Sequence, residues 1–124
     1  MNLTGKIIHG EGRGGCIGFP TLNIEGNFPG LEQGVYAVWV SLEQGRFRGA
    51  MNFGPQPTFG DSHVRVEVFL LDFDSDIYGE TATVEVVQKI REIQKFASAE
   101  ELKTQIMEDI SRVKSVLGLS YKLV

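Results

Sequence analysis

Gly18–Ile24 reads Gly-Phe-Pro-Thr-Leu-Asn-Ile, and the interpretation of the whole chain starts from this stretch. After the proline, polar Thr21 and Asn23 alternate with apolar Leu22 and Ile24. Alternation with a period of two predicts a β-strand that points Thr21 and Asn23 to one face. A hydroxyl and a carboxamide on one face, next to a flexible loop, can hold a metal ion and the phosphate oxygens that it bridges. A half-buried strand with one hydrated face is the alternative that this spacing leaves open.

The segment before this strand is rich in glycine. Gly10, Gly12 and Gly15 satisfy the G-x-G-x-x-G pattern, but in dinucleotide-binding folds that pattern opens a helix, and here an alternating strand follows. The P-loop pattern G-x-x-x-x-G-K-[ST] does not occur in the sequence. We therefore interpret Gly10–Gly18 as a flap between two strands whose amides can close over phosphates. An ordinary mobile hairpin is the alternative.

Composition favours one compact, strand-rich domain. The chain has 124 residues, enough to bury a core, and its 15 glycines and eight phenylalanines are typical of strands joined by tight turns. The net charge of −4 argues against a nucleic-acid-binding surface, so an anionic substrate would need a bound cation. The single cysteine, Cys16, excludes an internal disulfide and a Cys-based zinc site. Without a membrane-length apolar run or a signal-peptide pattern, we expect a cytoplasmic protein.

A second informative stretch is Val64–Phe73, which reads VRVEVFLLDF. If it is a strand, Glu67 shares one face with Arg65, Phe69 and Leu71, and the valines occupy the other face. Apolar neighbours would partly desolvate the Glu67 carboxylate and raise its pKa, which suits a general base. The alternative is a hydrated glutamate on an edge strand, loosely paired with Arg65.

The remaining elements follow from turn and capping patterns. Strands are expected near residues 5–10, 35–41, 47–53 and 81–87, whereas the two prolines in 54–61 predict a rigid loop. Residues 88–97 fit either a loop or a short helical turn. Ser98 and Glu101 form a capping-box pattern, and apolar residues then repeat at helical spacing to Gly118. Six strands and one terminal amphipathic helix predict a small antiparallel barrel.

Taken together, the motifs make the chain similar to the riboflavin kinase family of bacterial type, over about residues 5–117. The shared motifs are P-T-x-N at 20–23, G-V-Y at 34–36, N-x-G at 52–54, P-T at 57–58, E-V at 67–68, L-L-D-F at 70–73, Y-G at 78–79, Arg91 and K-F-x-S at 95–98. The resemblance is to the C-terminal kinase module of the bacterial bifunctional riboflavin kinase/FAD synthetase. It implies a six-stranded Greek-key barrel in a single domain, 1–124, with strands in about 5–87, a flavin loop in about 88–97 and a helix in about 98–117.

The resemblance also implies an activity, namely transfer of the γ-phosphoryl group of ATP to the terminal ribityl hydroxyl of riboflavin, releasing FMN and ADP. Glu67 would take the proton from the attacking hydroxyl, while Thr21 and Asn23 would hold Mg²⁺. Arg91 and Phe96 match the family's flavin loop. The residues that match its ATP site are Gly10, Gly12, Gly14, Gly15, Thr21, Asn23, Leu70, Asp72 and Tyr78.

Four positions depart from the family's usual pattern. Gly15 replaces a basic residue of the flap, Gln56 an arginine, Phe69 a histidine and Ile93 a glutamate of the flavin loop. Because the proposed base and both metal-binding residues are retained, we expect an active enzyme. A non-catalytic flavin- or nucleotide-binding barrel that regulates a larger protein is the alternative.

The expected partners are small molecules, riboflavin and ATP, and neither nucleic acid nor a membrane is expected. Bacterial members of the family commonly carry an N-terminal FMN adenylyltransferase domain. None of that domain's motifs occurs in these 124 residues, so we expect this chain to make FMN and not FAD.

Overall fold

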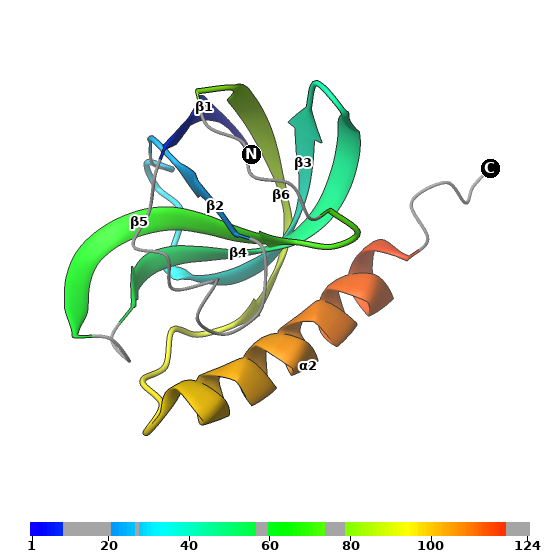
Figure 1. Ribbon diagram of the computed structural model, residues 1–124. Coiled ribbons are helices and arrows are strands. Elements are labelled where there is room, and N and C mark those ends of the chain that lie inside the picture. The colour runs from blue at the N-terminus through cyan, green and yellow to red at the C-terminus, as the bar shows by residue number, and fades with distance from the viewer. Residues whose placement is uncertain (9–20, 27, 57–59, 74–78, 119–124) are drawn as a thin grey trace.

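The computed structural model describes residues 1–8, 21–26, 28–56, 60–73 and 79–118, with side chains omitted at 56, 61 and 62. Its elements are β1 (Asn2–Ile8), β2 (Thr21–Ile24), β3 (Gly34–Leu42), β4 (Gly45–Gln56), β5 (Asp61–Leu70), β6 (Thr81–Arg91) and α2 (Ala99–Leu117). The strands form a closed antiparallel barrel in the order β1-β2-β5-β4-β3-β6 (Figure 1). β3, β4 and β5 are consecutive neighbours, and β6 returns to lie beside β3, as in a Greek key. The predicted fold class is confirmed.

The barrel interior is filled by alternate residues of the strands. Leu22 and Ile24 of β2 point inward, which leaves Thr21 and Asn23 on the outer wall. Phe28, which precedes β3, is also buried in the interior, with its ring edge-on to that of Phe53 at a centroid distance of 5.7 Å. The buried interior residues are Ile7, Leu22, Ile24, Phe28, Tyr36, Val38, Val40, Met51, Phe53, Val66, Val68, Leu70, Ala82 and Val84.

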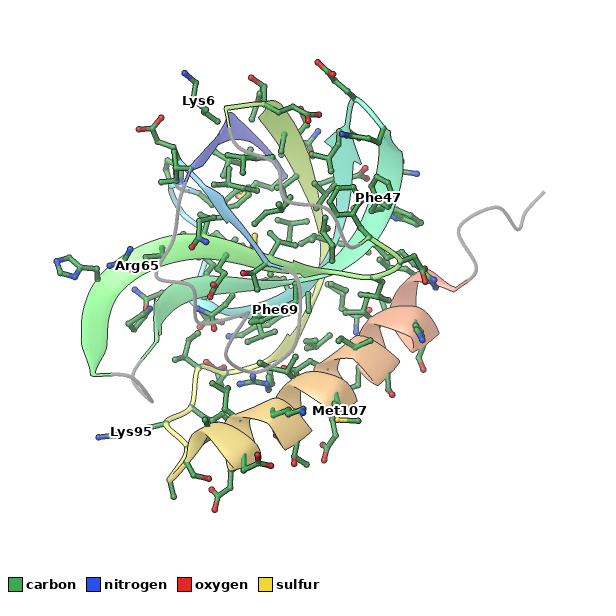
Figure 2. The ribbon with its side chains drawn as sticks, in the orientation of Figure 1. Lys6, Phe47, Arg65, Phe69, Lys95 and Met107 are labelled. Carbon is green, nitrogen blue, oxygen red and sulfur yellow. The ribbon has the colours of Figure 1, made fainter. Side chains whose placement is uncertain are left out.

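A second apolar layer lies between the outer wall and α2, which runs alongside the barrel (Figure 1). Phe69 of β5 packs in this layer, whereas Met107 of α2 is exposed to solvent (Figure 2). The buried members of the layer are Val35, Ala37, Ala50, Phe69, Leu71, Ile90, Ile106 and Val113. Within the described residues, no helix combines the length and the apolar character needed to cross a bilayer.

The helix begins as its capping pattern predicts. The Ser98 hydroxyl accepts a hydrogen bond from the Glu101 amide at 3.2 Å, and the Glu101 carboxylate accepts one from the Ala97 amide at 3.2 Å. The reciprocal bond therefore falls one residue earlier than in the usual capping box, where the N-cap amide is the donor.

Several strands begin or end elsewhere than the sequence suggested. β1 begins at Asn2, before the expected range 5–10, and β5 runs from Asp61 to Leu70 rather than over 64–73. β4 continues through Pro55 to Gln56, into the segment expected to be a rigid loop. The pairing with β5 shifts register between Gly54 and Gln56, so the proline lies at an irregularity where its missing N–H is tolerated. β6 continues to Arg91, so residues 88–91, which were expected to form a loop or a short helical turn, are strand. Two register shifts against β3 bring Arg91 opposite Val35.

Candidate active site

Glu67 lies at the centre of a polar row that crosses three neighbouring strands. It is directly opposite Asn23 of β2 on one side and Asn52 of β4 on the other. Because Val66 and Val68 point into the barrel, Glu67 points to the outer wall, yet it is only 3% exposed. Directly opposed residues in antiparallel strands have Cβ atoms about 5 Å apart, so the pairing places a buried carboxylate between two carboxamides.

Thr21 and Asn23 share the outer face of β2, and both are half-buried. Thr21 is opposite Phe69, and Asn23 is opposite Glu67. The three polar residues predicted to be catalytic or metal-binding are therefore brought onto one patch of the wall. Hydroxyl, carboxamide and carboxylate oxygens are the hard donors that Mg²⁺ prefers, and Mg²⁺ commonly takes few protein ligands because it keeps waters and substrate phosphates. The donor set fits this ion.

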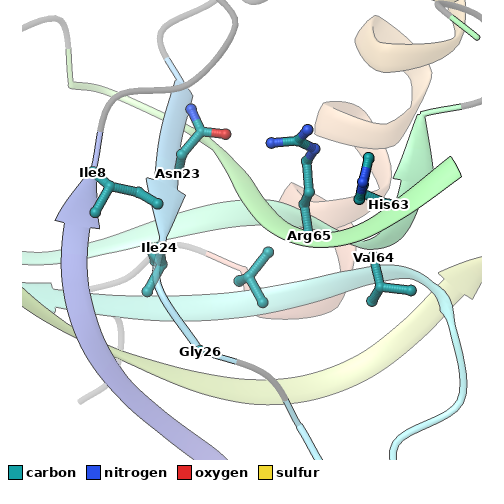
Figure 3. Close-up of a pocket in the computed structure, with 8 residues that line it drawn as sticks. Ile8, Asn23, Ile24, Gly26, His63, Val64 and Arg65 are labelled. Carbon is teal, nitrogen blue, oxygen red and sulfur yellow. The ribbon is translucent and has the colours of Figure 1, made fainter. Parts of the chain in front are cut away.

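A cavity of about 250 Å³ opens beside Asn23, between β1, β2 and β5 (Figure 3). Its lining includes Arg65 and His63 of β5 and Ile8 of β1. Figure 3 shows the Asn23 and Arg65 side chains rising on the same side of the sheet. Arg65 and Glu67 are two residues apart on one face of β5. The positive charge of Arg65, which lines the cavity, therefore lies next to the polar row.

Asn52 was not among the predicted site residues, although it belongs to the N-x-G motif at 52–54. Its carboxamide donates to the carbonyls of Gly54 and Pro55 at 3.4 and 3.3 Å, which supports the irregular end of β4. Gly54 has φ 142°, and a Cβ there would lie 3.4 Å from Ile93 Cδ1. Ile93, where the family usually has glutamate, therefore packs against this end of β4.

The two predicted flavin residues lie together at the end of β6. The Arg91 guanidinium lies 5.7 Å from the centroid of the Phe96 ring. Its Nε and Nη2 donate to the two carboxylate oxygens of Asp109 on α2, each at 2.8 Å. The sequence did not point to Asp109, because the helical spacing predicts an apolar stripe on this face of α2. A charged residue on the same face as Ile106 and Val113 is the signal that could have revealed it.

A charged cluster joins the same region to the segment that precedes β3. Lys89 of β6 forms ion pairs with Glu32 and with Glu92, the latter at 2.8 Å. Hydrogen bonds to Glu32 and Glu92 raise the pKa of Lys89. The Tyr36 hydroxyl donates to the Glu32 carbonyl at 2.5 Å, and burial raises the pKa of Tyr36. These contacts anchor the start of the segment that carries Phe96.

The residues predicted to bind ATP are only partly described. Asp72 is exposed, with φ 60°, and its carboxylate pairs with Arg48 at 2.9 Å. Arg48 also donates to the Gly118 carbonyl at the end of α2, at 2.6 Å. Leu70 points into the barrel interior, so a contact with a ligand on the outer wall would come from its main chain. Gly10, Gly12, Gly14, Gly15 and Tyr78 lie outside the described residues.

Comparison with known sequences identifies relatives over most of the chain. The flavokinase family model, described as riboflavin kinase, matches residues 1–117. The RNA-binding riboflavin kinase RibR of Bacillus subtilis is 40% identical over 112 residues, covering 90% of this chain and 49% of that protein. The bifunctional riboflavin kinase/FMN adenylyltransferase of Haemophilus influenzae is 42% identical over 115 residues, covering 91% of this chain and 37% of that protein. The chain thus spans half or less of the length of these relatives.

Solved structures share the fold. A chain described as a macrolide-efflux protein from Streptococcus pneumoniae superposes with a TM-score of 0.79 at 34% identity, covering 91% of this chain and 38% of that one. Riboflavin kinase from Trypanosoma brucei superposes with a TM-score of 0.63 at 26% identity, covering 94% of this chain and 78% of that one.

Proposed function

The chain belongs to the riboflavin kinase family, and we propose that it transfers the γ-phosphoryl group of ATP to the terminal ribityl hydroxyl of riboflavin, giving FMN and ADP. One observation carries the proposal for this chain's own residues: the strand register sets the buried Glu67 carboxylate directly opposite Asn23. That row combines a proton acceptor with oxygen donors suited to a metal–phosphate complex.

Glu67 acts as the general base. The attacking ribityl hydroxyl must lose its proton as the new O–P bond forms, and the carboxylate accepts that proton. Burial shields Glu67 from water, so its charge acts on the bound hydroxyl more strongly than an exposed carboxylate would. A positioned base of this kind contributes about 10²–10⁴-fold to the rate.

Thr21 and Asn23 would hold Mg²⁺ together with the nucleotide phosphates. The bound ion supplies neutralisation of the charge that develops on the transferring phosphoryl group. Phosphoryl transfer depends mainly on positioning and charge neutralisation, and an acidic chain needs a cation for both. The half-buried setting of the two side chains leaves their oxygens accessible to a ligand on the outer wall.

Arg91 and Phe96 bind the flavin. The guanidinium and the ring are both flat, and they lie close together at the end of β6, where the chain turns towards α2. Flat cationic and aromatic groups suit a planar heteroaromatic ligand, because both can stack on its face.

The proposal is tested by incubating the pure chain with riboflavin, ATP and Mg²⁺ and separating the flavins by chromatography. We expect FMN to appear only when both ATP and Mg²⁺ are present, with ADP formed in equal amount. Reactions with ADP in place of ATP, or with a chelator, are the controls. Riboflavin binding without FMN would overturn the kinase proposal in favour of a non-catalytic flavin-binding barrel.

A further inference from the structure

We propose that Asp109 is a positioning residue of the flavin site, because it holds the Arg91 guanidinium in a single orientation from across the helix–barrel interface. The inference rests on the proposed function, and it assigns a role to a residue of α2 that lies outside the polar row.

The geometry of the pair is bidentate. Arg91 Nε donates to Asp109 Oδ1 and Nη2 donates to Oδ2, both at 2.8 Å. Two parallel bonds between a guanidinium and a carboxylate fix the plane of the guanidinium as well as its location. The third nitrogen, Nη1, donates to the Glu92 carbonyl at 3.0 Å. With these bonds from the described residues, each terminal nitrogen keeps one N–H for a ligand.

Both members of the pair are themselves anchored. The main chain of Arg91 is paired with Val35 in the barrel wall. Asp109 Oδ1 also accepts a hydrogen bond from Gln105 Nε2, one helical turn earlier, at 3.1 Å. The carboxylate is therefore held by its own helix, and the arginine by its own strand.

The burial of the pair is hard to explain by stability alone. The Asp109 side chain is 3% exposed and that of Arg91 is 14% exposed, so both charges lose most of their hydration. Buried ion pairs can often be replaced by apolar residues without loss of stability. Ile106 and Val113 show that apolar residues pack well on this same face of α2. A fixed orientation for Arg91 is a function that an apolar pair could not supply.

The consequence is a preorganised binding surface. Arg91 has a little exposed surface left, next to the Phe96 ring at 5.7 Å. A ligand that meets an already oriented guanidinium does not lose affinity to the ordering of that side chain. Without the Asp109 charge, Arg91 would keep its own charge but sample several orientations.

The test is the variant Asp109→Asn in the full chain. The dissociation constant of riboflavin is measured by quenching of its fluorescence, and the KM for ATP is measured separately. We expect the riboflavin constant to rise about tenfold, as when one well-placed hydrogen bond to a ligand is lost, while the KM for ATP stays unchanged. Asp109→Glu, which keeps the charge but moves it by one methylene, is expected to raise the riboflavin constant as well. It provides the same test if Asp109→Asn does not fold.

Two control variants separate positioning from general damage. Glu108→Gln removes the same charge from an exposed neighbour, and Val113→Ala weakens the packing of the same helix face. Both should leave the riboflavin constant unchanged at a temperature where circular dichroism shows folded protein. An equal rise of the riboflavin dissociation constant in Val113→Ala would overturn this inference but not the proposed function. An unchanged dissociation constant in folded Asp109→Asn or Asp109→Glu would do the same. Failure of the unaltered chain to bind riboflavin would overturn both this inference and the proposed function.

Discussion

The two faces of the same barrel wall differ in what they bury. The interior is closed by six strands and holds apolar side chains, whereas the outer side of the barrel also buries carboxylates. Among the described residues, the buried charged side chains are Glu67 and Asp109, and both lie outside the barrel. Glu67 stands between Val66 and Val68 in the chain, so a single step along β5 separates a core residue from the proposed general base. Strand alternation thus lets one strand carry both core residues and a proposed functional residue.

The difference has a physical origin. A carboxylate is costly to bury unless hydrogen bonds or opposite charges compensate the lost hydration. The outer side of the barrel can supply such groups, because a helix, a strand end and loops meet there. Asp109 illustrates this, since Arg91 and Gln105 together donate three hydrogen bonds to it.

The largest effect is expected from Met51→Ala in the interior. Met51 is fully buried in the interior cluster, and its truncation should lower the free energy of unfolding by about 2–5 kcal/mol. Urea unfolding followed by circular dichroism measures the loss. The KM values for riboflavin and for ATP of the folded fraction should not change. A marked change in either value would show that the interior residues affect the site on the outer wall.

Next comes Glu67→Gln on the outer wall of the barrel. Replacing the proposed base by a neutral group of the same shape should lower the rate of FMN formation by ~10²-fold or more while leaving the KM for ATP nearly unchanged. Single-turnover assays measure the rate. Glu85→Gln, at an exposed position, controls for the change in charge and should keep full activity. Normal turnover in Glu67→Gln would remove Glu67 from the mechanism.

A smaller effect is expected from Thr21→Ala and Asn23→Ala. Each removes one oxygen donor from the outer face of β2, so each should raise the Mg²⁺ concentration needed for half-maximal rate by about tenfold and lower turnover with it. Titration with Mg²⁺ at fixed ATP is the measurement. If both variants show the Mg²⁺ dependence of the unaltered chain, the metal assignment is wrong.

The smallest effect is expected from Ser98→Ala. Loss of the bond from the Glu101 amide should cost about 1 kcal/mol of stability through α2, without altering the Mg²⁺ dependence. Thermal unfolding followed by circular dichroism detects it. Ser98→Asp, which can still cap the helix, should restore the midpoint. A midpoint unaffected by Ser98→Ala would show that the helix layer does not depend on its cap.

Local patterns in the sequence predict much of this architecture. Alternation around Asn23 and Glu67 indicates which face of its strand each residue occupies, and the Ser98 cap marks the start of α2. Alternation does not reveal which residues of different strands are opposite each other. The position of Asn52 beside Glu67 depends on the β4–β5 register, which neither strand specifies alone.

Other features were missed because their causes are not local. In the sequence, Asp109 only interrupts an apolar stripe. Its ion pair with Arg91 becomes evident only when β6 and α2 are placed together in the fold. The pairing of β6 with β3 up to Arg91 includes two register shifts. The residues of β6 alone do not predict these shifts. The continuation of β4 past Pro55 similarly depends on an irregularity in its pairing with β5.

The closure of the barrel also sets an order for folding. β3, β4 and β5 follow one another in the chain and pair as neighbours, whereas β1 pairs with β6 across most of the sequence, with Asn2 opposite Glu85. Contacts between distant segments form late and make folding slow, typically ~10⁻³–1 s for barrels of this kind. During synthesis β1 emerges first and must wait for β6 before the barrel can close. We expect the central meander that carries Glu67 to form before its ends are joined.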